Sequence, residues 1–99
     1  MASDRLRTSD VDALLEALLT LETPEEVYAF LQDVCTVREV QDIAQRLAVA
    51  RMLAAGKHYN DIEAATGASS TTISRVSRAF NYGADGYRQV IERLELGDA

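Results

Sequence analysis

The sequence has little of what several classes of small protein require. It contains one cysteine (Cys35), one histidine (His58) and no tryptophan among its 99 residues. A single cysteine cannot form an internal disulfide, and a single histidine without carboxylates at ligand spacing does not make a metal site. We therefore expect neither a disulfide scaffold nor a bound metal, and we expect Cys35 to be a small buried residue rather than a nucleophile.

Long apolar runs are missing as well. No stretch is long enough to span a bilayer, and the first residues are not followed by the apolar segment of a signal peptide. The sequence also shows no carboxylate pair with recognisable spacing, no glycine-rich phosphate loop and no nucleophile elbow. We predict a cytoplasmic protein that has no membrane partner and is not an enzyme.

The length and the apolar content are those of one small globular domain, which we place at residues 1–99. With 47% hydrophobic residues the chain can form a core, but a chain this short leaves a large share of its surface exposed and is often completed by a partner subunit. Dimerisation is therefore an early expectation.

The apolar residues recur at intervals of three and four, and no segment alternates apolar and polar residues as a half-buried strand would. The fold class is therefore all-α. Capping signals at Ser9, Thr23 and Thr36, a proline at Pro24 and a stop at Gly56 delimit the first three helices. The six predicted helices cover residues 10–21, 24–35, 37–55, 60–66, 70–80 and 87–97. The apolar stripe of the second helix is interpreted as a core face.

The segment at about 60–80 predicts a helix-turn-helix. Gly67 supplies the positive φ that the turn requires, and Ser69 is placed to cap the second helix. A set of apolar residues then falls where the two helices would pack together: Ile62, Ala65, Ala68, Ile73 and Val76. On the second helix, Val76 and Phe80 point inward with Ile73, while short hydroxyl and basic side chains point outward: Thr71, Ser74, Arg75 and Arg78.

Charge is distributed unevenly along the chain. The total is −6, which argues against binding to nucleic acid by bulk charge. Residues 51–82 nevertheless carry four basic against two acidic side chains, whereas residues 1–50 carry four against ten. The positive charge gathers where the helix-turn-helix lies, and its outward face suits the major groove of DNA. Plain helix packing with a solvated basic face is the alternative interpretation.

Three motifs together resemble the Trp repressor superfamily, and more narrowly its small members of the YerC/YecD type. The motifs are the run Thr36-Val37-Arg38-Glu39, the helix from Arg46 to Gly56, and the run from Gly67 to Arg75. The resemblance covers residues 8–95. It implies a six-helix subunit in an intertwined homodimer, whose two recognition helices meet successive major grooves of a roughly palindromic operator.

The resemblance also carries over individual positions. With the outward face derived above, it gives the candidate DNA-binding residues Asn60, Ser69, Ser70, Thr71, Thr72, Ser74, Arg75 and Arg78. Glu63 stands where the family has a basic residue just before the turn. A carboxylate at this position weakens non-specific attachment to DNA, although it can also accept a hydrogen bond from cytosine.

Arg46 and Arg75 match the two arginines that flank the corepressor in the tryptophan repressor, so both are candidate ligand-binding residues. Two neighbouring positions depart from that pattern, because Val76 replaces a glycine and Ala79 replaces a serine. The added isopropyl group takes up space for the indole, and the lost hydroxyl removes a partner of the ammonium. We expect no tryptophan corepressor. The two arginines then serve as a phosphate contact and an ion-pair partner, or they bind another small anion.

The sequence favours a homodimeric, sequence-specific regulator of transcription that binds double-stranded DNA. A protein-interaction module built on a helix-turn-helix scaffold is the alternative, and the acidic first half of the chain keeps it open. The two hypotheses differ in their response to salt, because DNA binding through several phosphates weakens steeply as salt rises.

Overall fold

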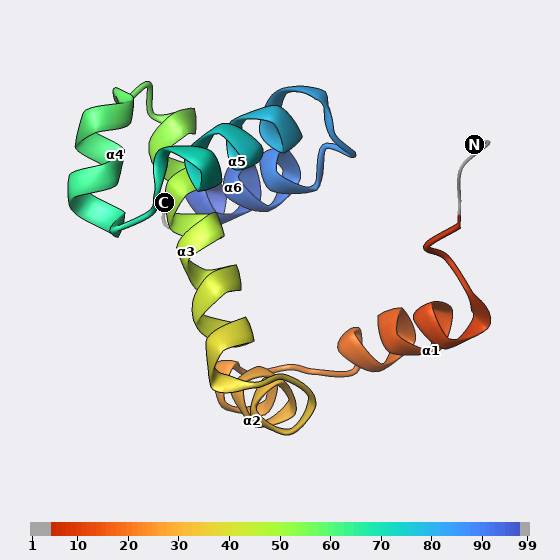
Figure 1. The fold of residues 1–99 in the computed structure, drawn as a ribbon. Coiled ribbons are helices and arrows are strands. Elements are labelled where there is room, and N and C mark those ends of the chain that lie inside the picture. Colours follow the sequence, from red (N-terminus) through yellow and green to blue (C-terminus); the bar gives the residue numbers. More distant parts are fainter. Residues whose placement is uncertain (1–4, 98–99) are drawn as a thin grey trace. The chain divides into compact units, whose positions relative to one another are not determined.

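The computed structural model describes residues 5–97, and these residues form six α-helices and no strand. Figure 1 shows them in chain order: α1 (Ser9–Leu18), α2 (Pro24–Val34), α3 (Val37–Ala54), α4 (Tyr59–Thr66), α5 (Ser70–Tyr82) and α6 (Gly86–Gly97). The prediction of an all-α fold with six helices is confirmed.

The chain divides into two compact units, residues 1–40 and residues 41–99. The first unit holds α1, α2 and the first turn of α3, and the second holds the remainder of α3 with α4, α5 and α6. The helix-turn-helix therefore lies entirely within the second unit.

Helix α1 begins and ends earlier than the sequence suggested. Its N-cap is Thr8 and not Ser9, because the Thr8 hydroxyl accepts a hydrogen bond from the backbone N–H of Val11 at 3.2 Å. The helix ends at Leu18, three residues before the predicted end. Beyond it, the hydroxyl of Thr20 donates to the carbonyl of Ala17 at 2.7 Å, so a local side chain provides a hydrogen-bond partner in the last turn.

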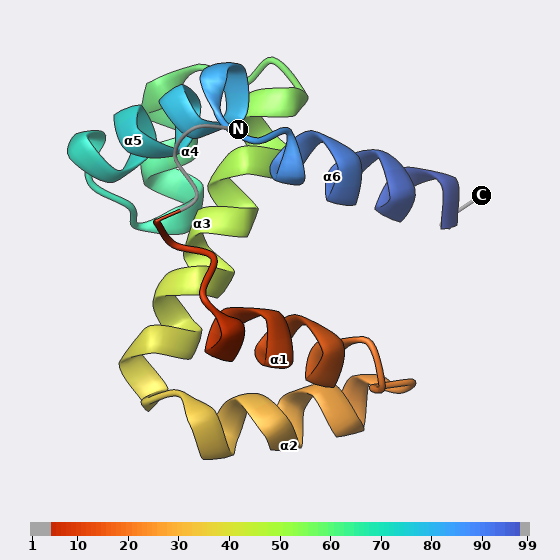
Figure 2. The same cartoon turned by 90° about the vertical axis from the view of Figure 1, so that its right-hand side faces the viewer.

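Helix α2 starts as its capping signals predicted (Figure 2). Thr23 accepts a hydrogen bond from the backbone N–H of Glu26 at 3.1 Å. The carboxylate of Glu26 reaches back one residue beyond the cap and accepts from the N–H of Glu22 at 2.8 Å. The helix ends at Val34, one residue before the predicted end, because Cys35 has extended backbone angles.

The apolar stripes of α1 and α2 do not form a core within this single chain. Neither helix contains a buried residue, and Val34 is 57% exposed. The interpretation of the α2 stripe as a core face is therefore wrong for the isolated subunit. Cys35 is half-buried and not fully buried, because it lies at the C-cap of the same exposed helix.

Helix α3 opens with the reciprocal capping box that its sequence predicted. The N–H of Thr36 donates to a carboxylate oxygen of Glu39 at 2.8 Å, and the N–H of Glu39 donates to the Thr36 hydroxyl at 3.1 Å. The helix ends at Ala54, and Gly56 follows with a φ of +78°. This positive φ confirms Gly56 as the residue that stops the helix.

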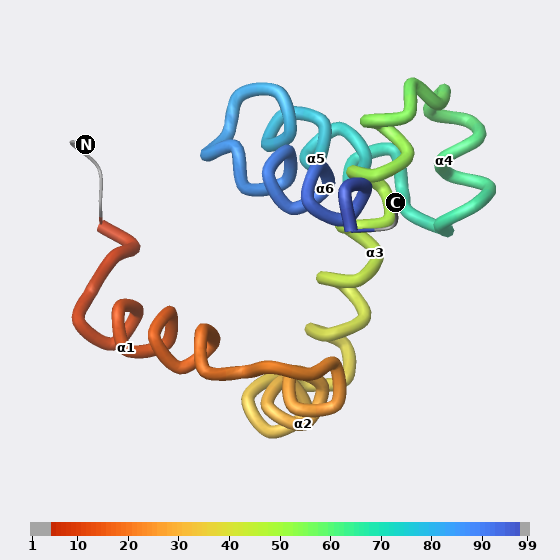
Figure 3. The backbone as a smooth tube through the Cα atoms, turned by 180° about the vertical axis from the view of Figure 1, so that it is seen from behind, coloured from red at the N-terminus to blue at the C-terminus, as the bar shows by residue number. Residues whose placement is uncertain are grey.

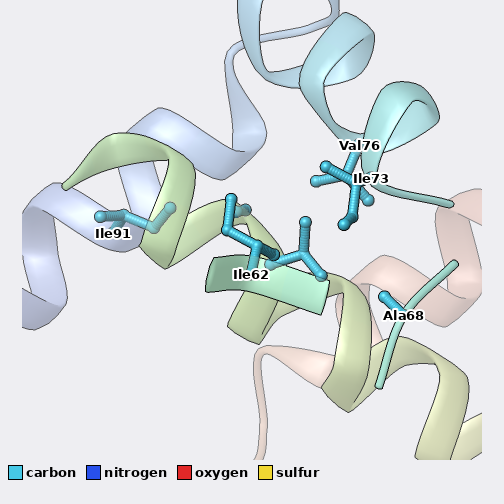
Figure 4. Packing of buried hydrophobic residues seen from close by; sticks show 7 residues of the cluster. Ile62, Ala68, Ile73, Val76 and Ile91 are labelled. Atoms are coloured by element: carbon cyan, nitrogen blue, oxygen red, sulfur yellow. The ribbon is translucent and has the colours of Figure 1, made fainter. Parts of the chain in front are cut away.

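The core of the second unit collects buried side chains from α3, the helix-turn-helix and α6 (Figure 4). Its members are Val49, Ala50, Ile62, Ala68, Ile73, Val76 and Ile91, and Phe80 and Tyr87 pack against them with part of their surface exposed. Four of the five residues predicted to pack between the two helices are therefore buried. Ala65 is exposed, because the eight-residue α4 buries only Ile62.

Candidate nucleic-acid interface

The turn between α4 and α5 has the geometry of a helix-turn-helix. Gly67 ends α4 in the left-handed region, at φ +73° and ψ +4°, and its N–H donates to the carbonyl of Glu63 at 2.9 Å. Two residues later, the Ser69 hydroxyl accepts a hydrogen bond from the N–H of Thr72 at 3.1 Å and caps α5. Both predicted roles are confirmed.

Two further residues hold this turn, and sequence reasoning missed them. The hydroxyl of Thr66 donates to the carbonyl of Ile62 at 2.7 Å and accepts from the N–H of Ala68 at 3.1 Å. The side-chain amide of Gln45 on α3 donates to the carbonyl of Thr66 at 3.1 Å. The threonine before Gly67 is a recognisable local signal, whereas the Gln45 contact joins residues 21 positions apart and leaves no pattern in the sequence.

Helix α5 presents two opposite faces. Ile73 is 0% exposed and Val76 is 3% exposed, so the core fixes the rotation of the helix about its own axis. Thr71, Ser74, Arg75 and Arg78 are all exposed, as predicted. The helix continues to Tyr82, two residues past its predicted end. Figure 3 follows the chain from α4 through the turn into α5 and on to α6.

The remaining candidate residues lie at the start of the two helices. Asn60 is exposed in the first turn of α4, and Ser70 is exposed in the first turn of α5. Thr72 is half-buried, and its hydroxyl accepts a hydrogen bond from the Ser69 hydroxyl at 3.2 Å. Ser69 and Thr72 therefore bond to each other at the helix start, while Asn60 and Ser70 present their side chains to solvent.

The start of α5 is favourable for an anion. The first turn of the helix contains no acidic residue, and the free backbone N–H groups of a helix N-terminus carry a partial positive charge. Glu63 is exposed on α4 and is the nearest acidic residue before the turn in the sequence. The basic and hydroxyl side chains of α5 thus extend from a helix end whose partial positive charge favours an anion.

Arg46 and Arg75, the two candidate ligand-binding residues, occupy different surroundings. Arg46 lines a largely apolar hollow of about 530 Å³ together with Ala79 and Tyr87. Neither Arg75 nor Val76 is among the described residues that line this hollow. Val76 instead belongs to the packed core, so its isopropyl group occupies core space.

The C-terminal end of α5 is held by a residue that sequence reasoning did not select. The guanidinium of Arg88, on α6, lies 4.2 Å from the centroid of the Phe80 ring and donates to the Phe80 carbonyl at 2.9 Å. It also donates to the side-chain oxygen of Asn81 at 3.1 Å. These contacts lie in the last turn of α5, which extends to Tyr82, two residues beyond the predicted end.

Residues 5–97 contain no group of three or more histidine, cysteine or acidic side chains that could hold a metal ion. Over the same part of the chain, no helix is both long enough and apolar enough to cross a membrane.

Comparison with known proteins identifies the family. Residues 9–95 match the family model of the Trp repressor protein. The chain belongs to the Trp repressor family. It is 48% identical over 95 residues to the uncharacterized protein YerC of Bacillus subtilis (strain 168), and the match covers 96% of this chain and 91% of YerC.

Two crystal structures share the Trp repressor fold of this chain. A TrpR like protein from Eubacterium eligens ATCC 27750 is 47% identical with a TM-score of 0.90, and the match covers 94% of this chain and 96% of that protein. A protein from Staphylococcus aureus is 45% identical with the same TM-score of 0.90, covering 96% and 95% of the two chains. The predicted resemblance is confirmed. The Trp repressor family indicates a helix-turn-helix DNA-binding regulator and not an enzyme.

Proposed function

We propose that this member of the Trp repressor family regulates transcription by binding a specific sequence of double-stranded DNA as a homodimer. The observation that carries the proposal is the division of α5 into a buried face, with Ile73 and Val76, and an exposed face, with Thr71, Ser74, Arg75 and Arg78. Small hydroxyl side chains permit close approach to base edges, and arginine can bond to guanine or to phosphate. The exposed face of α5 is therefore the surface that enters the major groove.

The homodimer is supported by the apolar surface that the single chain leaves uncovered. Helices α1 and α2 bury no residue, and their leucine and valine side chains remain exposed, with Leu14 at 40%, Leu18 at 38% and Val34 at 57%. Monomeric proteins rarely leave extended apolar faces in water. The occupant we propose is the same face of a second copy, because a self-complementary contact closes into a twofold dimer.

Twofold symmetry sets the form of the DNA site. Two copies of α5 related by a twofold axis read two half-sites of opposite orientation, so the operator is roughly palindromic. In helix-turn-helix dimers the half-sites lie about 34 to 36 Å apart, one turn of the duplex. The dimer then contributes to recognition of the DNA sequence and not only to the stability of the fold.

No corepressor is part of this proposal. Ala79 offers no hydroxyl to an amino group in the hollow beside Arg46. DNA binding therefore does not require tryptophan. Arg75 is assigned to DNA through its place on the exposed face of α5, and Arg46, on α3, is left for another small anion or an ion pair.

The experiment that tests the function is selection of the purified protein on a random pool of duplex DNA at about 150 mM salt, followed by sequencing of the retained duplexes. We expect enrichment of a palindrome. A folded, dimeric protein that enriches no sequence contradicts the proposal. A protein complex that survives high salt, found together with that result, favours the interaction module instead, because phosphate-based binding weakens between about 50 and 200 mM salt.

A further inference from the structure

The C-terminal turn of α5 lacks the stabilising groups that helix ends ordinarily carry. The last carbonyl groups of a helix have no partner within the helix, and a basic side chain in the last turn commonly compensates for them. Helix α5 has no basic residue in its last turn. The carbonyl of Ala79 accepts from the N–H of Gly83, whereas the carbonyl of Phe80 takes its partner from α6.

Arg88 supplies those partners from α6. One guanidinium makes three contacts with two consecutive residues of α5: it lies over the Phe80 ring at 4.2 Å, it donates from Nε to the Phe80 carbonyl at 2.9 Å, and it donates from Nη2 to Asn81 Oδ1 at 3.1 Å. The planar fork of arginine suits such paired bonds, and lysine cannot reproduce them. The positive charge is also placed at the negative end of the helix dipole.

The contact continues into the middle of α5. The side-chain amide of Asn81 donates from Nδ2 to the carbonyl of Ser77 at 2.9 Å, while its oxygen accepts from Arg88. Ser77 lies between Val76, which is buried, and Arg78, which is on the exposed face. Arg88 is thereby connected through Asn81 to the turn that presents Arg78.

The backbone of the turn between α5 and α6 leaves little freedom. The N–H of Gly83 donates to the carbonyl of Ala79 at 2.8 Å, and a Cβ atom at Gly83 would collide with that same carbonyl oxygen. Asp85 then has a φ of +67°, which is uncommon outside glycine. These two backbone features, at Gly83 and at Asp85, set the direction in which α6 begins. In that direction the side chain of Arg88 contacts Phe80.

We infer that Arg88 is a positioning residue for DNA recognition: it holds the C-terminal half of α5, and with it Arg78, in the orientation in which the helix reads the major groove. The inference rests on the proposed function and adds a residue outside the recognition helix. It differs from a direct phosphate contact by Arg88, because the guanidinium acts here on the helix and not on the DNA.

The two roles give different results with DNA. Loss of a phosphate contact weakens binding to all sequences alike and lowers the salt slope of binding by about 1. Loss of a positioning contact lowers the affinity for the selected operator more than the affinity for random duplex. The ratio of the two affinities therefore separates the roles.

The test compares Arg88→Ala with Arg93→Ala, which removes the same charge from the same helix. We expect Arg88→Ala to weaken operator binding roughly tenfold, equivalent to about 1.4 kcal/mol, with a smaller change on random duplex. Arg93→Ala should leave the ratio at its wild-type value. Arg88→Lys keeps the charge but loses the paired bonds, so it should restore only part of the affinity ratio that Arg88→Ala loses.

A second variant and a second measurement distinguish a loss of positioning from a general loss of folding. Asn81→Ala removes the side-chain acceptor of Arg88 and the bond to the Ser77 carbonyl without changing any charge, and it should lower the same affinity ratio. Amide hydrogen exchange on the free proteins should be faster at residues 79–83 in both Arg88→Ala and Asn81→Ala, with α4 unchanged.

The outcomes separate this inference from the proposed function. If wild-type protein binds its operator and Arg88→Ala keeps the wild-type affinity ratio, the inference alone is overturned. An equal loss on all duplexes with a smaller salt slope, or full binding by Arg88→Lys, assigns Arg88 to phosphate and also overturns it. Failure of wild-type protein to bind any selected duplex overturns the proposed function and the inference together.

Discussion

The hydroxyl groups of Ser69 and Thr72 bond to each other at the first turn of α5. Ser69 Oγ accepts from the backbone N–H of Thr72 at 3.1 Å and donates to the Thr72 hydroxyl at 3.2 Å. This pair fixes the residue at which α5 begins. The position of Thr71 and Ser74 on the exposed face depends on that starting point, because each residue added or removed turns the helix by about 100°.

Replacement of this cap should lower stability. Ser69→Ala removes the hydroxyl that satisfies the Thr72 N–H, and losing such a cap lowers the free energy of unfolding by about 1 kcal/mol. Urea denaturation followed by circular dichroism measures the loss. Ser70→Ala is the matched control, since Ser70 is the exposed next residue and does not cap the helix. Equal losses in the two variants would contradict the capping role.

The turn at Gly67 should tolerate a side chain only at a conformational cost. No atom lies within 4 Å of a Cβ built at this position, so the cost of Gly67→Ala comes from its φ of +73° and not from a collision. An L-residue in the left-handed region costs about 1 to 2 kcal/mol. Thermal or urea unfolding should show this loss for Gly67→Ala and a smaller one for Gly67→Asn, because asparagine tolerates the region better.

Gly86→Ala provides the comparison for the turn. Its Cβ also meets no atom within 4 Å, and its φ is not in the left-handed region. We expect little change in its unfolding free energy. A loss for Gly86→Ala as large as that for Gly67→Ala would show that backbone strain is not what makes glycine necessary at position 67.

A charge placed on the exposed apolar face of α1 should separate the proposed dimer into monomers. Leu14 is 40% exposed in the single chain, so Leu14→Glu would be mild if this face met water. If a second copy covers the face, a buried charge without a partner opposes association strongly. Sedimentation velocity at micromolar concentration should show monomer for Leu14→Glu and dimer for Ala13→Glu, because the exposed Ala13 lies about 100° around α1 from Leu14. Dimers in both samples would argue against the proposed contact.

Tryptophan should not control DNA binding. The hollow beside Arg46 is lined by Ala79, which offers no hydroxyl to hold an amino group. Isothermal titration of the protein with tryptophan should give no binding heat, and added tryptophan should leave the DNA affinity unchanged. Micromolar binding in the titration would show that the hollow accepts the amino acid without that hydroxyl.

The sequence predicted those features that neighbouring residues determine. Spacing and residue type were enough to predict the roles of Gly67, Ser69 and Ile73, because each role depends on residues only a few positions away in the sequence. The end of α5 could not be predicted, because it depends on the hydrogen bond from Arg88 of α6 to the carbonyl of Phe80, which lies eight residues earlier in the sequence. Burial along α2 was predicted and is absent from the single chain, because periodicity identifies an apolar face without telling which chain covers it.

Binding of the double variant Arg75→Ala/Arg78→Ala to the selected palindrome tests the central claim, that the exposed face of α5 contacts DNA. Fluorescence anisotropy at fixed salt, with Arg93→Ala as the control for charge, gives the affinity. The account predicts a loss of more than about tenfold for the double variant, as expected when arginine contacts to bases or phosphates are removed, and near wild-type binding for the control. Wild-type affinity in a folded, dimeric double variant would contradict it.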